Sequence, residues 1–306
     1  MDLHQRITDR KGEFLLFAVT PPRLSTPPER TREIAQVTLE RIAPIGIDGL
    51  ILYDIFDESD RNPEERPFPF AHTLDPAEYL RRDLSELDVP AIVYRATGKY
   101  PEADLRGWLE AQDCERTLSV FVGASSKDRE VATSLRRAQE LRREASPDLL
   151  LGAVAIPERH TQKGDEHLRM IAKQEAGVSY FVTQVVYDVT AAKNLVSDYK
   201  YACDERGIDP VPIVFTYSVC GSLKTLEFLQ WLGVHVPGWI QNELAHATDT
   251  LEASYDQAIA SATNLIEFCR RLGVPVGLNI ESVSIRKVEI EASVRLACHL
   301  RDELRR

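Results

Sequence analysis

LLLGAVAIPERH at residues 149–160 and GVSYFVTQVVYD at residues 177–188 are the stretches that decide the fold. Each begins as an apolar run and ends in polar residues, and the polar segment 163–175 between them is typical of an amphipathic helix. Continuous apolar runs are expected of strands that are buried on both faces of a parallel sheet. The two stretches therefore predict a strand, a crossover helix and a second parallel strand.

Polar residues follow both of these predicted strands. In parallel sheets and barrels, ligands bind beyond the carboxyl ends of the strands. We therefore expect one site that gathers the polar residues from both strand ends. They are Glu158, Arg159, His160, Thr183, Gln184, Tyr187 and Asp188.

The same alternation of apolar runs and helical segments extends along the whole chain. The other predicted strands cover residues 13–19, 49–55, 89–94, 117–123, 211–217 and 276–280. Eight strands that alternate with helices favour an α/β fold and a single (β/α)8 TIM barrel, which would be one catalytic domain over residues 1–306. The polar, proline-rich segment 57–73 is long for a loop in a compact domain, and such loops usually carry function.

Composition narrows the class of protein. Of the 306 residues, 43% are hydrophobic and 28% are charged, and no apolar run approaches the roughly 20 residues that span a bilayer. The N-terminus lacks the apolar core of a secretory signal, so we expect a cytoplasmic protein without membrane contact. The net charge of -11 argues against a nucleic-acid partner and favours a small-molecule ligand.

Several common cofactor motifs are absent from the sequence. The five cysteines are scattered and have no metal-ligand spacing, so they predict neither disulfides nor a zinc site, and no metal is expected. No Gly-x-Gly-x-x-Gly follows a predicted strand, and no Walker-type phosphate loop occurs. Nucleotide binding of the Rossmann or P-loop kind is therefore not indicated.

Five short motifs, in order along nearly the whole chain, resemble those of the methylenetetrahydrofolate reductase family. The strand-six motif, Val182-Thr183-Gln184-Val185-Val186-Tyr187-Asp188, is the most specific of them. The other four are Phe17-Ala18-Val19-Thr20-Pro21-Pro22-Arg23, Ile156-Pro157-Glu158-Arg159-His160, Lys173-Gln174-Glu175-Ala176-Gly177 and Val234-His235-Val236-Pro237-Gly238-Trp239. The resemblance implies a barrel that reduces 5,10-methylenetetrahydrofolate to 5-methyltetrahydrofolate with NADH or NADPH.

The chain departs from the family pattern at several positions. Where the family has a strand-one glutamate that assists protonation of the folate, this sequence has Ala18. The flavin-contacting Arg-Gly-Asp of strand four corresponds to residues 122–124, which read Val-Gly-Ala, and the tyrosine before Pro157 is Ile156. The strand-three His-Leu-Thr is replaced by apolar or bulky residues, Ile92, Val93 and Tyr94. These losses favour a form of the family that binds no FAD.

A reductase without flavin still needs an acid to open the ring of methylenetetrahydrofolate. Ring opening gives an iminium cation, which can accept a hydride directly from a nicotinamide. The acid must lie near Ala18, and in a closed barrel the neighbours of strand one are strands two and eight. Asp54 ends strand two and Glu281 ends strand eight, so these two carboxylates are the candidate catalytic residues. Asp57 and Glu58 of the long loop are further candidates for the acid, after Asp54 and Glu281.

The family motifs also suggest residues for binding, and each has an ordinary structural alternative. An amide such as Gln184 suits the edge of a pterin but could equally secure a loop. Arg23 and Arg286 could hold the folate glutamate tail or pair with a neighbouring acid. We expect the substrate to contact Gln184, Thr183, Tyr187, Arg23 and Arg286. We expect the cofactor to contact Thr20, Tyr53, Glu158, His160 and Lys173.

Alternatives for the cofactor-binding residues also stay open. Glu158 and His160 could form an acid pair or cap a loop, and Lys173 could hold a phosphate or complement the dipole at the end of its helix. Two other functions are compatible with the sequence. One is a catalytically silent folate-binding or partner protein on the same barrel, and the other is an unrelated barrel enzyme, since a fold alone does not fix chemistry.

Overall fold

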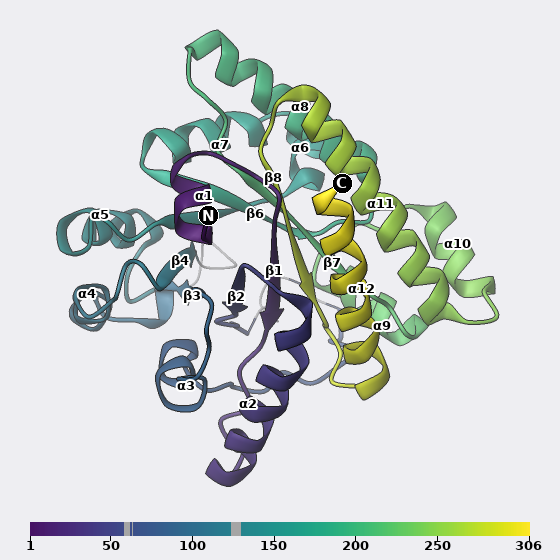
Figure 1. Ribbon diagram of the computed structural model, residues 1–306, viewed down its shortest axis with the longest axis horizontal. Coiled ribbons are helices and arrows are strands. Elements are labelled where there is room, and N and C mark those ends of the chain that lie inside the picture. Colours follow the sequence, from purple (N-terminus) through teal and green to yellow (C-terminus); the bar gives the residue numbers. More distant parts are fainter. Residues whose placement is uncertain (58–61, 63, 124–129) are drawn as a thin grey trace.

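Eight parallel strands close into a barrel in chain order, because β8 pairs with β1 (Figure 1). The structure is a computed structural model that describes residues 1–306 except 58–61, 63 and 124–129. The strands are β1 (Phe14–Val19), β2 (Gly49–Leu52), β3 (Ala91–Ala96), β4 (Thr117–Val122), β5 (Leu151–Ala155), β6 (Val178–Val185), β7 (Ile213–Ser218) and β8 (Val276–Glu281). The expected single (β/α)8 barrel is confirmed.

The helices surround this barrel in Figure 1, and α12 lies against β1 and β8. They are α1 (Leu3–Thr8), α2 (Pro28–Ile42), α3 (Pro76–Asp83), α4 (Glu102–Glu110), α5 (Leu135–Ala145), α6 (Pro157–Lys163), α7 (Glu166–Glu175), α8 (Val189–Arg206), α9 (Leu223–Trp231), α10 (Gly238–His246), α11 (Thr250–Leu272) and α12 (Lys287–Arg305). Short 3-10 turns cover Ala43–Ile45 and Thr97–Lys99. Among the described residues, no helix has the length and apolar character needed to cross a membrane.

The elements differ from the sequence-based expectation in three places. Strand two ends at Leu52 rather than at residue 55, because β1 stops at Val19, whose carbonyl accepts the last bond, from the amide of Tyr53. The expected helix 163–175 begins only at Glu166, and a separate helix, α6, precedes it and ends at Lys163 because Gly164 adopts φ +67°. Helix α1 was not expected, since six residues give too little periodicity to recognise.

Apolar side chains fill the barrel from within. Residues that alternate along the strands point inward, and Leu3 and Ile7 of α1 join this interior cluster and close its N-terminal end. The interior members from the strands include Phe14, Leu16, Ile51, Ile92, Leu118, Val120, Tyr180, Val182 and Val214. The outward-facing residues form a second, larger apolar layer with the helices. Polar side chains that point inward can therefore reach solvent only at the C-terminal mouth.

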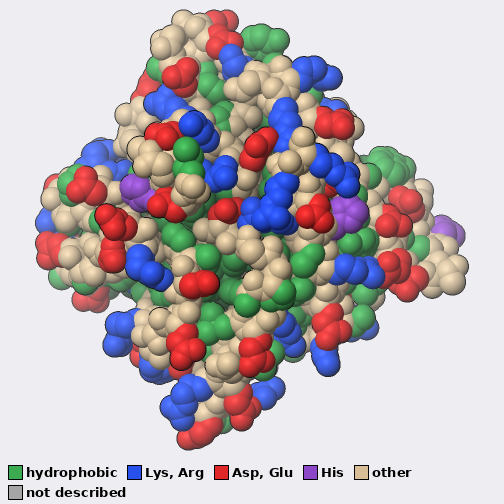
Figure 2. Space-filling model, in the orientation of Figure 1, with side chains coloured by type: hydrophobic (Ala, Val, Ile, Leu, Met, Phe, Trp, Pro, Cys, Tyr) green, Lys and Arg blue, Asp and Glu red, His purple; other side chains and the backbone are tan. Residues whose placement is uncertain are grey.

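The outer surface mixes charges of both signs. On the face shown in Figure 2, acidic side chains lie among Lys and Arg side chains, and neither sign forms a large continuous block. Many of these charges are paired along or between helices, for example Arg137 with Glu102 at 3.0 Å and Arg295 with Glu252 at 2.6 Å. This face therefore offers no basic strip of the kind that follows a phosphate backbone.

Close packing at Gly152 gives a first test of the barrel interior. A Cβ atom there would lie 2.4 Å from the ring of Tyr180, whose hydroxyl donates to the carbonyl of Ser119 at 3.0 Å and so fixes the ring. We expect Gly152→Ala to lower the free energy of unfolding by about 1–3 kcal/mol, as overpacking does. Urea unfolding monitored by circular dichroism measures the change.

Gly107 provides the matched control, because it lies within α4 and a Cβ atom there meets nothing within 4 Å. Gly107→Ala should raise the free energy of unfolding by about 0.5–1 kcal/mol through helix propensity alone. If both alanine variants shifted stability in the same direction, the packing described for Gly152 would be incorrect.

Candidate active site at the barrel mouth

A chain of polar side chains crosses the mouth of the barrel from β7 to β2. Asn279 of β8 donates to the hydroxyl of Thr216 at 3.2 Å and to the hydroxyl of Tyr53 at 3.0 Å. The hydroxyl of Tyr53 donates in turn to a carboxylate oxygen of Glu281. Tyr94 packs edge-on against Tyr53, with ring centroids 4.9 Å apart, and forms an aromatic wall beside the acid.

The polar side chains at the mouth have space because residue 18 is an alanine. β1 lies between β2 and β8, and its register places Ala18 opposite Ile51 on one side and Glu281 on the other. Tyr53 and Glu281 therefore have to meet across the end of β1. The small side chain of Ala18 leaves the space above β1 open, so the carboxylate from β8 occupies the region next to residue 18.

Burial changes the acidity of Glu281. Loss of hydration raises the pKa of this carboxyl group to about 7, while the hydrogen bond from Tyr53 pulls the pKa in the opposite direction. Burial and the nearby charge of Glu281 both raise the pKa of Tyr53 well above its usual range, so the phenol stays protonated. At neutral pH a large fraction of Glu281 therefore carries a proton, as a general acid requires.

Asp54, the other candidate acid, has a different environment. It follows Tyr53 in the chain and points away from the barrel interior. Its carboxylate accepts from the amide of Ala96 at 2.7 Å and from the hydroxyl of Tyr100 at 2.8 Å, and pairs with Lys99 at 2.5 Å. All of these partners lie at or after the end of β3. Asp54 thus anchors the β3–α4 connection and does not join Tyr53 and Glu281.

Of the two further acids, Asp57 is among the described residues and Glu58 lies outside them. The later part of the same long loop packs on α9. Trp231 donates to the carbonyl of Glu64 at 2.9 Å, and Phe68 lies edge-on to Phe228 at 5.3 Å. The loop from β2 therefore reaches an element that follows β7.

A β-bulge changes the direction of the side chains at the end of β6. The register between β6 and β7 shifts between Val182 and Val185, and the hydroxyl of Thr183 accepts from the amide of Thr216 at 3.1 Å across the gap. The amide of Gln184 donates to the carbonyl of Leu232 at 2.8 Å, just beyond α9. The hydroxyl of Thr183 therefore has a partner on β7. Gln184 secures a loop but remains partly exposed at the mouth.

Tyr187 and the two arginines lie in three separate places. Tyr187 is buried in a small apolar cluster with α9 and α10, so its expected contact with substrate is not supported by its position. Arg23 is exposed in the β1–α2 connection, where its backbone forms a bridge with Thr73. Arg286 is exposed at the rim beside β8, where it lies 3.6 Å from Glu289 and donates to the carbonyl of Gly221 at 3.4 Å.

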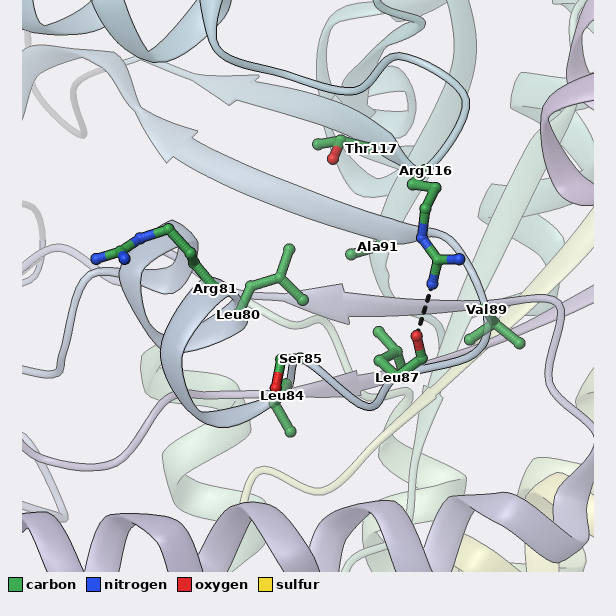
Figure 3. Close-up of a pocket in the computed structure, with 9 residues that line it drawn as sticks. All are labelled: Leu80, Arg81, Leu84, Ser85, Leu87, Val89, Ala91, Arg116 and Thr117. Atoms are coloured by element: carbon green, nitrogen blue, oxygen red, sulfur yellow. Dashed lines mark hydrogen bonds between the residues drawn. The ribbon is translucent and has the colours of Figure 1, made fainter.

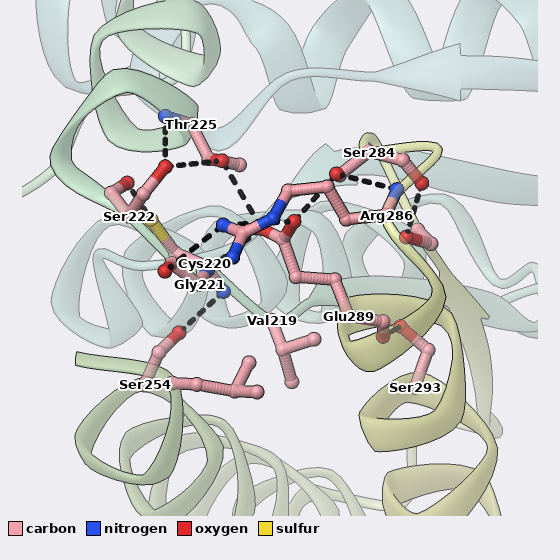
Figure 4. Close-up of polar contacts among 12 residues, drawn as sticks. Val219, Cys220, Gly221, Ser222, Thr225, Ser254, Ser284, Arg286, Glu289 and Ser293 are labelled. Carbon is pink, nitrogen blue, oxygen red and sulfur yellow. Dashed lines mark hydrogen bonds and ion pairs between the residues drawn. The ribbon is translucent and has the colours of Figure 1, made fainter. Parts of the chain in front are cut away.

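Glu289 organises this part of the rim, as Figure 4 shows. Its fully buried carboxylate accepts from the amide of Gly221 at 2.8 Å, from Thr225 at 3.0 Å and from Ser284 at 2.5 Å. These donors come from the β7–α9 and β8–α12 connections. Because a buried carboxylate with three donors is held rigidly, both connections and Arg286 keep fixed positions at the mouth.

The residues expected to hold a cofactor are mostly engaged by the chain itself. Lys173 donates to the carbonyl of Val154 at 2.7 Å, and burial lowers the pKa of its amine. His160 lies 3.0 Å from Asp198 of α8, in the helical layer, and this contact takes it away from the mouth. Thr20 is exposed just after β1, and Tyr53 is the partner of Glu281. Lys173 and His160 therefore both have partners within the chain.

Glu158 is unusual among these residues. It is buried, and neither of its carboxylate oxygens has a hydrogen-bond partner among the described residues. Burial raises the pKa of Glu158 to about 6, and the nearby charge of Asp188 acts in the same direction. Asp188 caps α8 and pairs with His235 at 3.4 Å. Glu158 therefore faces the β6–α8 connection, on the opposite side of the mouth from Ala18.

Sequence reasoning missed Asn279 and Thr216, the two residues that connect Tyr53 with β7. Both are buried, and both lie within apolar runs. An asparagine inside the final strand, VGLNIE at residues 276–281, was the available signal. A polar amide at an inward position of a buried strand needs hydrogen-bond partners, and these are found only near the mouth.

Two cavities lie at the other end of the barrel. A cavity of about 190 Å³ lies between α3 and the N-terminal ends of β3 and β4, and Arg116 closes part of it by donating to the carbonyl of Leu87 at 2.6 Å (Figure 3). A second, of about 210 Å³, shares Leu87 and Val89 with it. In (β/α)8 barrels the N-terminal face serves stability and the C-terminal face serves catalysis. The candidate site therefore lies at the C-terminal mouth of the barrel.

A protein-family model matches the part of the chain that forms β5 to β8. The family model described as methylenetetrahydrofolate reductase matches residues 122–290, which include β5 to β8 and Glu281. A search of curated proteins found no match.

The chain is similar to a solved structure of an uncharacterized protein from Clostridium thermocellum that binds two copies of 5-methyl-5,6,7,8-tetrahydrofolic acid. The two chains share 42% identity, the match covers 98% of this chain and 99% of that one, and the TM-score is 0.87. More distant likenesses include Xanthomonas albilineans dihydropteroate synthase and Paenibacillus barcinonensis xylanase XynB. The synthase has 13% identity, a TM-score of 0.45 and coverage of 98% and 97%, and the xylanase has 10%, 0.49 and 92% and 87%. Neither of these bears on function.

The raised pKa of Glu281 predicts how stability depends on pH. The folded protein holds this proton up to a pKa of about 7, whereas an unfolded glutamate releases it near pH 4.5. The folded state therefore binds more protons between these values, and stability falls as pH rises from 5 to 8. Glu281→Gln removes this contribution.

We expect Glu281→Gln to gain stability relative to the wild type as pH rises, by on the order of 1–3 kcal/mol between pH 5 and pH 8. Urea unfolding of both proteins across this range gives the difference, in which other titrating groups cancel. A stability difference that does not change with pH would contradict the assignment.

Proposed function

Because the chain belongs to the methylenetetrahydrofolate reductase family, we propose that it reduces 5,10-methylenetetrahydrofolate to 5-methyltetrahydrofolate with NADH or NADPH and without bound flavin. The observation that carries the proposal is the carboxyl group of Glu281, which accepts from Tyr53 and lies opposite Ala18, where the family has its acid. The folate bound by the Clostridium thermocellum relative is the product of this reaction, which supports the same substrate class.

In the proposed reaction, Glu281 donates its proton to the bridging nitrogen of the folate, and the carbon–nitrogen bond to the methylene group breaks. The electron pair of that bond stays on the protonated nitrogen, and an iminium cation forms at the other nitrogen. A hydride from the reduced nicotinamide then adds to the methylene carbon, which gives the methyl product and oxidised nicotinamide. The carboxylate of Glu281 stabilises the cation while it exists.

The surrounding residues have defined parts in this proposal. Tyr53 donates to Glu281 and keeps its carboxylate oriented after the proton has left. Tyr94, and the ring of Tyr53 beside it, offer flat apolar surfaces on which the pterin and nicotinamide rings can stack at reactive distance. Gln184 offers an amide oxygen to the pterin edge. Arg286 and Arg23, exposed at the rim, are positioned for the glutamate tail.

The same positions support a reaction without flavin. The two side chains that could hold flavin phosphates, Lys173 and His160, have partners within the chain. Apolar or small residues occupy the positions where the family contacts the flavin ring. Direct transfer from the nicotinamide needs no redox group in the protein, because the nicotinamide supplies both electrons with the hydride.

The cofactor requirement gives the most direct test of the reaction. We expect the purified protein to be colourless and to oxidise NADH or NADPH only when methylenetetrahydrofolate is present, with no increase on addition of FAD. Absorbance at the nicotinamide band and chromatographic detection of 5-methyltetrahydrofolate measure the turnover. Flavin that copurifies at one per chain would overturn the flavin-free mechanism, and folate binding without nicotinamide oxidation would favour a silent folate-binding protein.

The two candidate acids can be separated by paired substitutions. We expect Glu281→Gln to lower kcat by about 10²–10⁴ with a similar KM, because the amide cannot donate the proton. Asp54→Asn should leave kcat within about tenfold of the wild type and instead lower the melting temperature, since it breaks the contacts with Lys99 and Tyr100.

The pH profile provides the control for this pair. Because the acid must be protonated, kcat/KM of the wild type should fall as pH rises through about 7, and the residual activity of Glu281→Gln should lose this limb. If Asp54→Asn lost as much activity as Glu281→Gln while remaining folded, the assignment of the acid to Glu281 would be incorrect.

A further inference from the structure

Two histidines and an aspartate meet in the helical layer behind β5 and β6. His160 belongs to α6, His167 to α7 and Asp198 to α8. One ligand atom from each of the three residues lies within 4.8 Å of the others. His160 Nε2 and a carboxylate oxygen of Asp198 are 3.0 Å apart, and the two imidazole rings lie edge to face with centroids at 5.1 Å.

The fold holds this cluster in place. Gly164 ends α6, and only Gly164 and Asp165 separate α6 from α7, so the two histidines lie on the two sides of a tight turn. α8 packs against both helices and presents Asp198 to them. The three side chains therefore come from segments whose relative positions are fixed by packing, whereas their separation in sequence hides the cluster.

The cluster leaves ring nitrogens unsatisfied. The Nδ1 atoms of His160 and His167 are both buried and have no hydrogen-bond partner among the described residues. A buried polar atom without a partner is costly in a folded protein. The contact with Asp198 explains one nitrogen of His160, but it does not explain why a second imidazole is placed against it.

The nearby positive charges are already neutralised. Arg159 pairs with the buried Glu166 at 3.2 Å, and Arg169 pairs with Asp165 at 3.1 Å. Asp198 is about half exposed, and His167 is partly exposed, so the cluster opens to solvent on one side. With neutral imidazoles the cluster carries one negative charge, which favours a divalent cation.

We propose that His160, His167 and Asp198 form a binding site for one divalent transition-metal ion such as Zn²⁺, with water completing the coordination. Imidazole nitrogen and carboxylate oxygen are ordinary zinc ligands, and tetrahedral binding at about 2.0–2.1 Å places ligand atoms about 3.3 Å apart. The contact of His160 with Asp198, at 3.0 Å, is close to this spacing. His167 closes the remaining gap by a rotation of its partly exposed ring.

The ion would join α6 and α7 to α8 on the outside of the barrel. Glu281 lies inside the barrel at the mouth, so the site is independent of the proposed reduction. Its expected effect is on stability, because an ion that binds only the folded state stabilises that state by mass action. Helices α6 and α7 also follow β5 directly, and the ion would therefore hold the segment that carries Glu158.

Metal titration of the full-length protein tests the proposal. After dialysis against a chelator, Zn²⁺ is titrated by calorimetry and Co²⁺ by visible absorption, which reports imidazole coordination. We expect one ion per chain and a rise in melting temperature with metal. Asp198→Asn and His167→Ala should each weaken binding at least about tenfold, in line with the loss of one of three ligands.

His299→Ala is the matched control, since His299 lies on α12, where it faces Tyr255 and Glu303. It should bind the ion as the wild type does. Circular dichroism shows whether each variant is folded, and Asp198→Asn, which changes a half-exposed side chain, keeps the test valid if His167→Ala does not fold. Absence of stoichiometric binding, or equal binding by all three variants, would overturn the proposal.

Discussion

A carboxyl group that is buried at the mouth of an apolar barrel needs a hydrogen-bond donor, and the contact between Tyr53 and Glu281 meets this need. The contact depends on Ala18, because β1 lies between the two strands that supply the partners. It also depends on Asn279, which donates to Tyr53 and so leaves the phenol hydroxyl free to donate to the acid. The apolar interior beneath this chain raises the pKa of Glu281. The raised pKa that the proposed acid needs therefore follows from packing at this one place.

The position of Glu281 also explains how the chain can differ from its family at residue 18. An acid on β1 and an acid on β8 at matching register reach nearly the same space, so loss of the first can be offset by the second. Lys173 and His160 have partners within the chain, Val154 and Asp198. The mouth offers an acid, aromatic surfaces and an amide, the groups that the proposed reaction uses.

The sequence predicted the strand order and the barrel because buried parallel strands leave long apolar runs that need no knowledge of distant contacts. It also pointed to Glu281, since strands one and eight must be neighbours in a closed barrel. It could not give the direction of the Asp54 side chain, because that direction depends on the residue where the strand stops. It could not give the partner of Thr183, because the β6 bulge arises from pairing with β7, and Asn279 was hidden inside an apolar run.

The ionisation of Glu281 in the substrate-free protein tests the central claim most directly. The side-chain carboxyl carbons can be labelled with ¹³C, and the resonance of Glu281 can be assigned by its absence from the Glu281→Gln spectrum. This account expects that resonance to titrate with a pKa of about 7. A midpoint near 4.5, the ordinary value for a glutamate in water, would show that the carboxyl group is neither buried nor poised as the acid, and would contradict the account.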